Sequence, residues 1–524
     1  MKLRSLVVVT ALCGCTGYIG DQEDPAEDGI RPRPSAPAVC ETLPPRIRRL
    51  APEQWDHVLA TLTPEGANAR TQYLSTLQLA SRFGGAAGTL GMTVPHVEQL
   101  LGTVEGLSTD IVDRLLADLD CSLEEAGCVD GAMGELLSRA FRREPRTEET
   151  ERYVSLVDDL TADLGAEDAL RAAAEVVLMS PESLYRSEIG EDGVLTPDEI
   201  ASAISFLVTD GPPDEALRAA ARSGQLQDGE VRAEHAERLF EERERASGVL
   251  RYFREYLHAD SSLTAARSEE TFPEFDADVR QAMVEEHRAF VEHVLWEDEG
   301  TFRALLTRPY TFANATLAAH YGLPTEGLGD GFARVETPDR MGILNHGSYL
   351  VQAGKEEGTS IVFRGVNVIE EFLCQETPAP PPDVDDVLPP RIEGRASTQR
   401  QRLEAHRSVG RCATCHDEID PVGYPFEVFD AVGRPRAEEQ GLPIDPSGSI
   451  VLDEGRVAVS NVRELATSLS EDPGAHRCFV RHVILFADGV ERSNACLGAP
   501  EDAPVLDMIR AHIASDDFIA REVP

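Results

Sequence analysis

The stretch TPDEIASAISFLV, residues 196–208, carries the clearest signal for the fold. Apolar side chains recur along it three and four positions apart, which is the spacing of one face of an α-helix. Thr196 precedes Pro197, and proline is tolerated at the first helical position, so the stretch also contains a helix start. These residues predict a helix with a buried face.

The same pattern continues on both sides of this stretch. Residues 172–180 (AAAEVVLMS), 214–223 (DEALRAAARS) and 278–296 (DVRQAMVEEHRAFVEHVLW) repeat it. Residues 441–459 differ, because turn residues surround a short β-branched run, and they predict one small β-hairpin. We therefore expect a mainly α fold, a multidomain helical assembly with one hairpin. The pentapeptide CATCH at residues 412–416 adds the expectation of a C-terminal cytochrome-c-like haem domain.

The length of 524 residues exceeds the usual size of one domain and predicts several. Composition shifts and proline-rich breaks mark the boundaries. The predicted segments are a lipoprotein signal peptide (1–14), an acidic Pro-rich tether (15–45), an N-terminal helical domain (46–190), a central helical domain (191–330), a haem-bearing domain (331–435) with a Pro-rich connector (378–390), and a C-terminal hairpin and helical domain (436–524).

The net charge of −44 is spread along the chain. Nucleic acid and anionic lipid surfaces are therefore poor partners, and neutral or cationic partners remain open. The acidity also suits a surface that keeps a protein hydrated in a salty medium.

The first residues predict export. Lys2 and Arg4 precede an apolar run of about ten residues, which is too short for a permanent membrane helix. The tetrapeptide that ends at Cys15 (LCGC) matches a bacterial lipobox, so we expect cleavage before Cys15 and lipid attachment to its sulfur. The residue after Cys15 is Thr16, whereas an Asp there would favour retention at the inner membrane. We therefore expect an outer-membrane anchor, with the protein facing the periplasm or the cell surface. The alternative is an ordinary signal peptide with a chance cysteine.

Ten cysteines are present, and export places them in an oxidising compartment. Six remain after Cys13, Cys15, Cys412 and Cys415 are assigned to other roles. The predicted disulfides are the local pairs Cys121–Cys128 and Cys478–Cys496 and a long-range bridge Cys40–Cys374.

The pentapeptide CATCH, residues 412–416, predicts a covalent c-type haem. Two cysteines three apart lie on one side of a helical turn, where both thiols can add to the haem vinyl groups. His416 is then the proximal iron ligand. The alternatives are a plain surface disulfide, a redox-active dithiol and a zinc site, although the chain offers no second ligand pair for zinc.

The second axial ligand is not fixed by spacing. His406, six residues before Cys412, is one candidate, and a five-coordinate iron remains open. The nearby alternatives are Met508, His476, His482, His512 and His346. The other ring nitrogen of His416 is expected to donate to a carbonyl in the turn around Pro421. His287 and His293 stand at the wrong interval for a zinc protease, so a helix-surface role is expected for both.

Several phrases in order carry a family resemblance. They include RRLAPEQWDHVLATL, LMSPESLYRSEIG, LLTRPYTFANATLAAHYGL, TSIVFRGVNVIEEFLC and RCATCHDEIDPVGYPFEVFDAVGRPR. From Arg46 to Arg521 the chain resembles a family of large exported cytochrome-c-containing proteins of planctomycetes and myxobacteria. The resemblance implies a mostly helical multidomain protein with one c-type haem and names no catalytic residue. In the family, Lys-Trp commonly follows the Arg-Gly pair that stands at 364–365, whereas this chain has Val366 and Asn367. Packing or docking at this place is therefore expected to differ from that of the family.

The first functional interpretation is an outer-membrane lipoprotein that transfers single electrons through one haem c to a redox partner protein. The alternatives are a peroxidase-like or oxidase-like haem enzyme, including one that acts with a polymer, and a non-redox surface binding protein with structural haem. Oligomeric state is not readable from the sequence.

Overall fold

A computed structural model describes residues 30–32, 39–63, 83, 93–378, 396–406 and 410–523. For residues 31, 32, 406 and 410–412 it describes the backbone alone. The predicted signal peptide, Cys15 and nearly all of the Pro-rich connector lie outside the described residues.

The described chain is mainly helical, as predicted. The N-terminal helices are α1 (Pro52–Leu62), α3 (Val94–Leu119), α4 (Cys128–Phe141), α5 (Thr147–Leu164), α6 (Ala166–Leu178) and α7 (Pro181–Leu184). The following helices are α8 (Pro197–Thr209), α9 (Glu215–Arg222), α10 (Gly229–Glu241), α11 (Ser247–Tyr256), α12 (Ser261–Thr264), α13 (Ala277–Glu297), α14 (Phe302–Thr307) and α15 (Ala315–Tyr321). The last are α16 (Gly347–Gln352), α17 (Ile361–Phe372), α18 (Gln399–His406), α19 (Gly410–Gly423), α20 (Val462–Glu471), α21 (Pro473–Asp488), α22 (Val505–Ala514) and α23 (Asp516–Ile519).

The strands form six antiparallel two-stranded sheets among the described residues, where the sequence predicted one hairpin. The predicted hairpin is present as β11 (Gly448–Leu452) with β12 (Gly455–Val459). The other pairs are β1 (Arg31–Pro32) with β8 (Gln375–Glu376), β2 (Arg46–Arg49) with β3 (Tyr185–Glu188), β4 (Tyr310–Ala313) with β5 (Ala333–Glu336), β6 (Gly354–Lys355) with β7 (Gly358–Thr359), and β9 (Glu438–Glu439) with β10 (Leu442–Pro443). Strands this short are stabilised mainly by their tertiary neighbours. The sequence therefore carries no periodic pattern that predicts them.

Helix α8 shows why the sequence signal was clear. The Thr196 side chain accepts a hydrogen bond from the Glu199 amide, and the Glu199 carboxylate accepts one from the Thr196 amide. This reciprocal cap satisfies amide groups that a helix start leaves without partners. Every residue from Ile200 to Thr209 is buried, so α8 is a central helix of the core.

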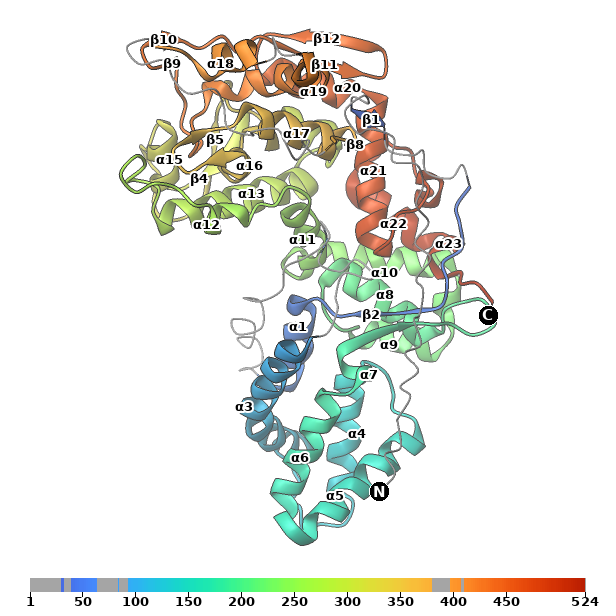
Figure 1. The fold of residues 1–524 in the computed structure, drawn as a ribbon. Helices are drawn as coiled ribbons and strands as arrows, with labels where there is room; N and C mark the ends of the chain where they lie inside the picture. Colours follow the sequence, from blue (N-terminus) through green and yellow to red (C-terminus); the bar gives the residue numbers. More distant parts are fainter. Residues whose placement is uncertain are drawn as a thin grey trace, which may run out of the picture.

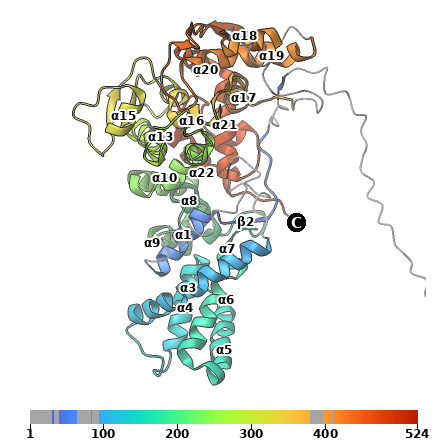
Figure 2. The same cartoon turned by 60° about the vertical axis from the view of Figure 1, so that its left-hand side comes forward.

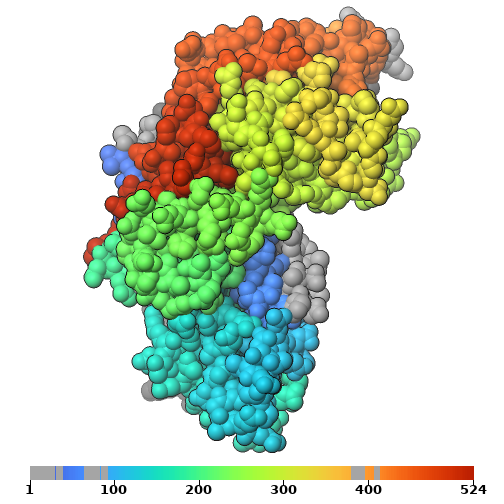
Figure 3. Space-filling model, turned by 180° about the vertical axis from the view of Figure 1, so that it is seen from behind, coloured from blue at the N-terminus to red at the C-terminus, as the bar shows by residue number. Residues whose placement is uncertain are grey.

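Figure 1 shows the helices α3 to α6 at one end of the molecule, α8 to α10 in the middle and α17 to α20 at the other end. Helices α21 and α22 run from that far end back to the middle, and Figure 2 shows the same arrangement from another side. One cluster of buried apolar residues extends from Leu195 to Ile519 and includes Phe83, and a second fills the N-terminal helices from Leu50 to Leu184 and includes Phe206. In Figure 3 the C-terminal residues pack directly against the middle of the chain. The predicted domain boundaries stay predictions.

All six remaining cysteines form disulfides, but two of the three predicted pairs are wrong. Cys121–Cys128 is confirmed, whereas the other bridges are Cys40–Cys496 and Cys374–Cys478. Cys478 lies on α21 and faces the end of α17, where Cys374 follows, while Cys496 lies in η7 (Asn494–Leu497) and meets the N-terminal segment. Nearness in sequence does not decide which neighbouring element a helical cysteine faces.

In the part of the chain that the structure describes, no helix combines the length and the apolar character that a membrane crossing requires.

Candidate haem-binding site

The CATCH pentapeptide lies in the first turns of α19, and α19 packs closely on α17. A Cβ atom on Gly365 would lie 2.2 Å from the carbonyl oxygen of Ile419, and one on Gly423 would lie 2.0 Å from that of Ile361. Both distances are too short for any side chain, so glycine at these two positions permits the close approach. The crossing fixes where α19 lies.

Arg364 of α17 holds the segment that follows α19. Its guanidinium donates to the carbonyl oxygens of Phe426 and Phe429 at 2.7 and 2.9 Å and to the Glu427 carboxylate at 3.0 Å. The Arg364 side chain is almost fully buried, and burial lowers its pKa to about 10. Arg436 donates to the other Glu427 oxygen at 2.8 Å. This buried network ties the EVFD turn to α17.

The predicted hairpin packs against α19, and α18 packs against α17 and against the segment that follows α19. A Cβ atom on Gly448 of β11 would lie 1.9 Å from the carbonyl oxygen of Pro421, so the hairpin touches the helix backbone. Leu403 of α18 is buried with Ile361 and Tyr424. The Arg400 guanidinium stacks over the Tyr424 ring at 4.1 Å. The pentapeptide helix is therefore supported on several sides by rigid elements.

His416 is held by a carboxylate, where a backbone carbonyl was expected. Its Nδ1 lies 2.8 Å from Oδ1 of Asp420, one residue before Pro421, and Asp420 is fully buried. The i, i+4 spacing on one helix brings the two side chains together. The Asp420 Oδ2 atom is buried and has no hydrogen-bond partner among the described residues. The His416 side chain is 21 % exposed, so it lies at the surface of the helix pair.

The thiols are placed by the same helix. Cys412 and Cys415 are three residues apart on α19, so their Cα atoms lie on one side of it. Cys415 is partly exposed. The side chains of Cys412 and of His406, the candidate distal ligand, lie outside the described residues. Two cysteines three apart on one helix, the second of them partly exposed, and an adjoining imidazole oriented by a buried carboxylate fit the donor set of a c-type haem.

The other candidate axial residues are engaged elsewhere. His512 lies 3.0 Å from Asp488, His476 lies 2.9 Å from the Ser470 carbonyl oxygen, and His482 lies 3.5 Å from the Cys374 sulfur. His346 lies 3.2 Å from His287, and Met508 is fully buried in the main core. Each of these side chains is therefore engaged away from α19, and all of them except His476 are buried.

The expectation for His287 was wrong, since its side chain is buried. Burial lowers the pKa of His287 to about 3, and repulsion from His346 adds to the effect. The neighbouring Glu286 is fully buried and accepts hydrogen bonds from Thr311, Tyr321 and the Gly347 amide. His287 lies on the apolar side of α13. Because histidine occurs both in cores and on surfaces, the residue type alone did not predict that its side chain is buried.

Comparison with known families divides the chain into three matched segments. Residues 128–188 match PSD5, a protein of unknown function (DUF1595), residues 195–323 match PSD4 (DUF1592), and residues 340–439 match PSCyt3 (DUF1588), both also of unknown function. These are planctomycete cytochrome-like domain families, and the three matches support a multidomain protein. The pentapeptide lies within the PSCyt3 match. No curated protein matches the chain, and no solved structure does.

Proposed function

We propose that this protein is an exported c-type cytochrome that carries one covalent haem at Cys412, Cys415 and His416 and exchanges single electrons with a partner protein. The observation that carries the proposal is the 2.8 Å contact from Nδ1 of His416 to the buried Asp420 carboxylate. Iron-binding histidines characteristically donate their other ring nitrogen to such a group. The PSCyt3 match over the same segment supports a cytochrome-related role.

The haem would supply a one-electron redox centre. The residues of the chain hold and orient it. Asp420 fixes the ring orientation and tautomer of His416, and a hydrogen-bonded carboxylate raises the basicity of a ligating imidazole. The buried Arg364–Glu427 contact and the glycine crossing of α17 and α19 keep the helix from moving when the charge of the centre changes. A site on rigid elements limits the reorganisation that electron transfer requires.

The proposal includes a lipid anchor at Cys15, supported by the lipobox LCGC and the short apolar run before it. The anchor would hold the protein at the outer membrane while a redox partner approaches. The acidic surface of the protein favours a redox partner with a basic docking face. Labelling with a fatty acid analogue checks the anchor, and a Cys15→Ala variant should lose both the label and membrane association.

The haem proposal is tested by expression with a bacterial cytochrome c maturation system and export. Intact mass should exceed the polypeptide by one haem, and the colour should stay with the protein in acid–acetone. The Cys412→Ser, Cys415→Ser double variant should lose both signals. The matched control Cys121→Ser, Cys128→Ser removes the short disulfide between the end of α3 and the start of α4, and it should keep both signals. Haem that is extracted from the wild-type protein by acid–acetone would refute covalent attachment.

The haem-enzyme alternative has a clear spectroscopic signature. A six-coordinate low-spin centre with a reversible redox titration supports electron transfer, whereas a high-spin iron that binds carbon monoxide or peroxide supports catalysis. A protein that contains haem but shows no redox response over a wide range of potentials would support the alternative in which the haem is structural.

A further inference from the structure

A histidine accompanies one of the long-range disulfides. Cys478 and His482 lie one turn apart on α21, and Cys374 follows the end of α17. The Nε2 atom of His482 lies 3.5 Å from the sulfur of Cys374 and 3.6 Å from that of Cys478. Residues four apart share one helix face, which is also the spacing of paired metal ligands on a helix. Among the described residues, no other group of three histidine, cysteine or carboxylate side chains brings its donor atoms within 4.8 Å of one another.

The three side chains lie in the core. Cys374, Cys478 and His482 are 6, 3 and 1 % exposed. The ring of His482 packs against the rings of Tyr256 and Phe83, at centroid distances of 5.1 and 6.3 Å. Packed neighbours therefore hold the donor atoms in place, as a preorganised binding site requires.

The two nitrogen–sulfur distances match those of a zinc site. Zinc–sulfur bonds of about 2.3 Å and zinc–nitrogen bonds of about 2.0 Å, at a tetrahedral angle, place nitrogen and sulfur about 3.6 Å apart. His482 already lies at this distance from both sulfur atoms. Two thiolates on the same ion lie about 3.8 Å apart, so the disulfide must first be open. The 5.4 Å between the Cα atoms of Cys374 and Cys478 is compatible with both states.

Charge also favours zinc. Two thiolates carry two negative charges, and Zn²⁺ cancels both, whereas Cu⁺ would leave one negative charge in the core. An uncompensated buried charge is unfavourable. The carbonyl oxygen of Glu371 lies 3.5 Å from the Cys478 sulfur, so an oxygen donor stands beside the cluster for the fourth position of the ion.

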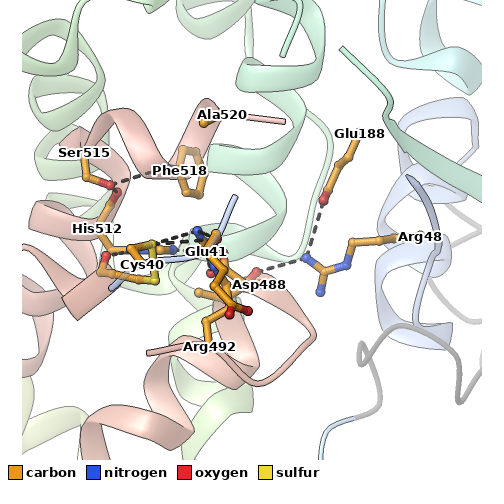
Figure 4. Close-up of polar contacts among 12 residues, drawn as sticks. Cys40, Glu41, Arg48, Glu188, Asp488, Arg492, His512, Ser515, Phe518 and Ala520 are labelled. Atoms are coloured by element: carbon orange, nitrogen blue, oxygen red, sulfur yellow. Dashed lines mark hydrogen bonds and ion pairs between the residues drawn. A yellow bond between two sulfur atoms is a disulfide. The ribbon is translucent and has the colours of Figure 1, made fainter. Parts of the chain in front are cut away.

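The bridge Cys40–Cys496 is surrounded differently. There the Arg492 guanidinium lies 2.9 Å from the Cys40 sulfur, as Figure 4 shows. Both ring nitrogens of the nearby His512 face oxygen atoms, Nδ1 the Cys496 carbonyl oxygen at 2.9 Å and Nε2 the Asp488 carboxylate at 3.0 Å. A guanidinium repels a metal cation, so this bridge is a matched control.

We propose that Cys374, Cys478 and His482 bind one Zn²⁺ when their disulfide is open. Each thiol gives up a proton, and two zinc–sulfur bonds and one zinc–nitrogen bond form. A disulfide of another exported protein reverses this: it takes two electrons from the thiolates and two protons from water and becomes a dithiol, while the Cys374–Cys478 bond forms and Zn²⁺ leaves. The metal-bound state and the disulfide state exclude each other. This site does not depend on the haem.

The test uses the full chain with Cys412→Ser and Cys415→Ser, so that the pentapeptide thiols and the haem take no part. The chain is produced in a bacterial host that lacks its exported disulfide oxidase, purified without oxygen, and checked by a thiol count. With zinc sulfate we expect one tightly bound Zn²⁺ per chain and a rise in Tm. Co²⁺ in its place should show tetrahedral bands and charge-transfer absorption from two thiolates. Oxidised glutathione should release the zinc as the thiol count falls.

A reduced chain that holds no Zn²⁺ overturns the proposal, and so does a Co²⁺ spectrum without two thiolate ligands. Cys374→Ser, Cys478→Ser should lose the ion, because the remaining imidazole is a single ligand. Cys40→Ser, Cys496→Ser removes the control bridge and should bind Zn²⁺ as the parent chain does. Retention of the ion in the first variant, or its loss in the second alone, would overturn this location.

The imidazole has its own pair of variants. His482→Gln should weaken Zn²⁺ binding at least about tenfold, because loss of a ligand costs no less than loss of a group that orients one. His512→Gln, beside the control bridge, should leave Zn²⁺ binding unchanged. If His482→Gln does not fold, the Co²⁺ spectrum of the parent chain still decides the ligand set. Equal Zn²⁺ affinity in His482→Gln and the parent chain would overturn the role of this histidine.

Discussion

Asp420 holds His416 from one helical turn further along α19, with 2.8 Å between Oδ1 and Nδ1. The same helix that carries the two cysteines thus carries the group that orients the imidazole. Because Asp420 is fully buried, the contact is shielded from water and is stronger than it would be at the surface.

Replacing Asp420 by Asn tests this relationship in the haem-loaded protein. The neutral amide makes His416 a less basic ligand, which destabilises ferric relative to ferrous iron. We expect the midpoint potential to rise, by roughly 60 mV if the carboxylate contributes a tenfold preference for the ferric state. Spectroelectrochemical titration measures it. Asp417→Asn, on the exposed side of the same helix, is the control, and an equal shift in both variants would indicate a general charge effect.

Gly365→Ala tests the crossing of α17 and α19. The new methyl group would lie 2.2 Å from the Ile419 carbonyl oxygen, so the two helices must separate. Overpacking of this kind costs roughly 1–3 kcal/mol of unfolding free energy. Denaturant unfolding followed by circular dichroism measures it. Gly358→Ala meets nothing within 4 Å and should leave the stability nearly unchanged. Equal stability of the two variants would contradict the close packing.

The disulfides should differ in what they contribute to stability. Cys374–Cys478 closes a loop of 104 residues and Cys121–Cys128 one of 7. Loop-closure entropy predicts that losing the first costs roughly 4.7 kcal/mol and losing the second about 2 kcal/mol, as upper values. Double alanine variants of each pair, compared by denaturant unfolding, check the order. Non-reducing peptide mapping should recover Cys374 with Cys478, and recovery of Cys478 with Cys496 would refute the pairing.

The buried pair of His512 and Asp488 predicts a pH dependence. Burial alone would lower the pKa of His512, but the Asp488 carboxylate raises it above its ordinary value. Burial would raise the pKa of Asp488, but His512 and Arg492 hold it well below its ordinary value. The histidine contribution is fully present below its unfolded pKa of about 6.5 and is lost as pH rises through the raised folded pKa. The carboxylate contribution is present above its unfolded pKa of about 3.9 and is lost in stronger acid.

A His512→Gln variant should therefore lose more stability at about pH 5.5 than at about pH 9. The unfolding free energy of both proteins at the two values checks this. His293→Gln, which removes a ring packed edge-on against Tyr310, is the control for loss of a histidine. A loss that is the same at both pH values would mean that the folded protein does not shift the pKa of His512.

Local patterns in the sequence were enough to predict a mainly helical fold. The periodicity of residues 196–208 and its Thr-Pro start predicted α8 with its buried face, and the turn residues around 448–459 predicted the hairpin β11–β12. The spacing within CATCH placed both cysteines and His416 on one helix, where the structure has them. These features depend on residues within a few positions of one another, so local propensity and periodicity decide them.

Tertiary structure alone decided which distant residues meet. The disulfide partners of Cys374 and Cys496, the contact of His287 with His346, and the convergence of Arg46, Arg186 and Arg521 on Glu188 each join segments that only the packed core brings together. Their energies come from burial and from charge in a low-dielectric interior, which depend on neighbours across the fold. A sequence states which side chains are present, and the packing of its helices decides which of them become partners.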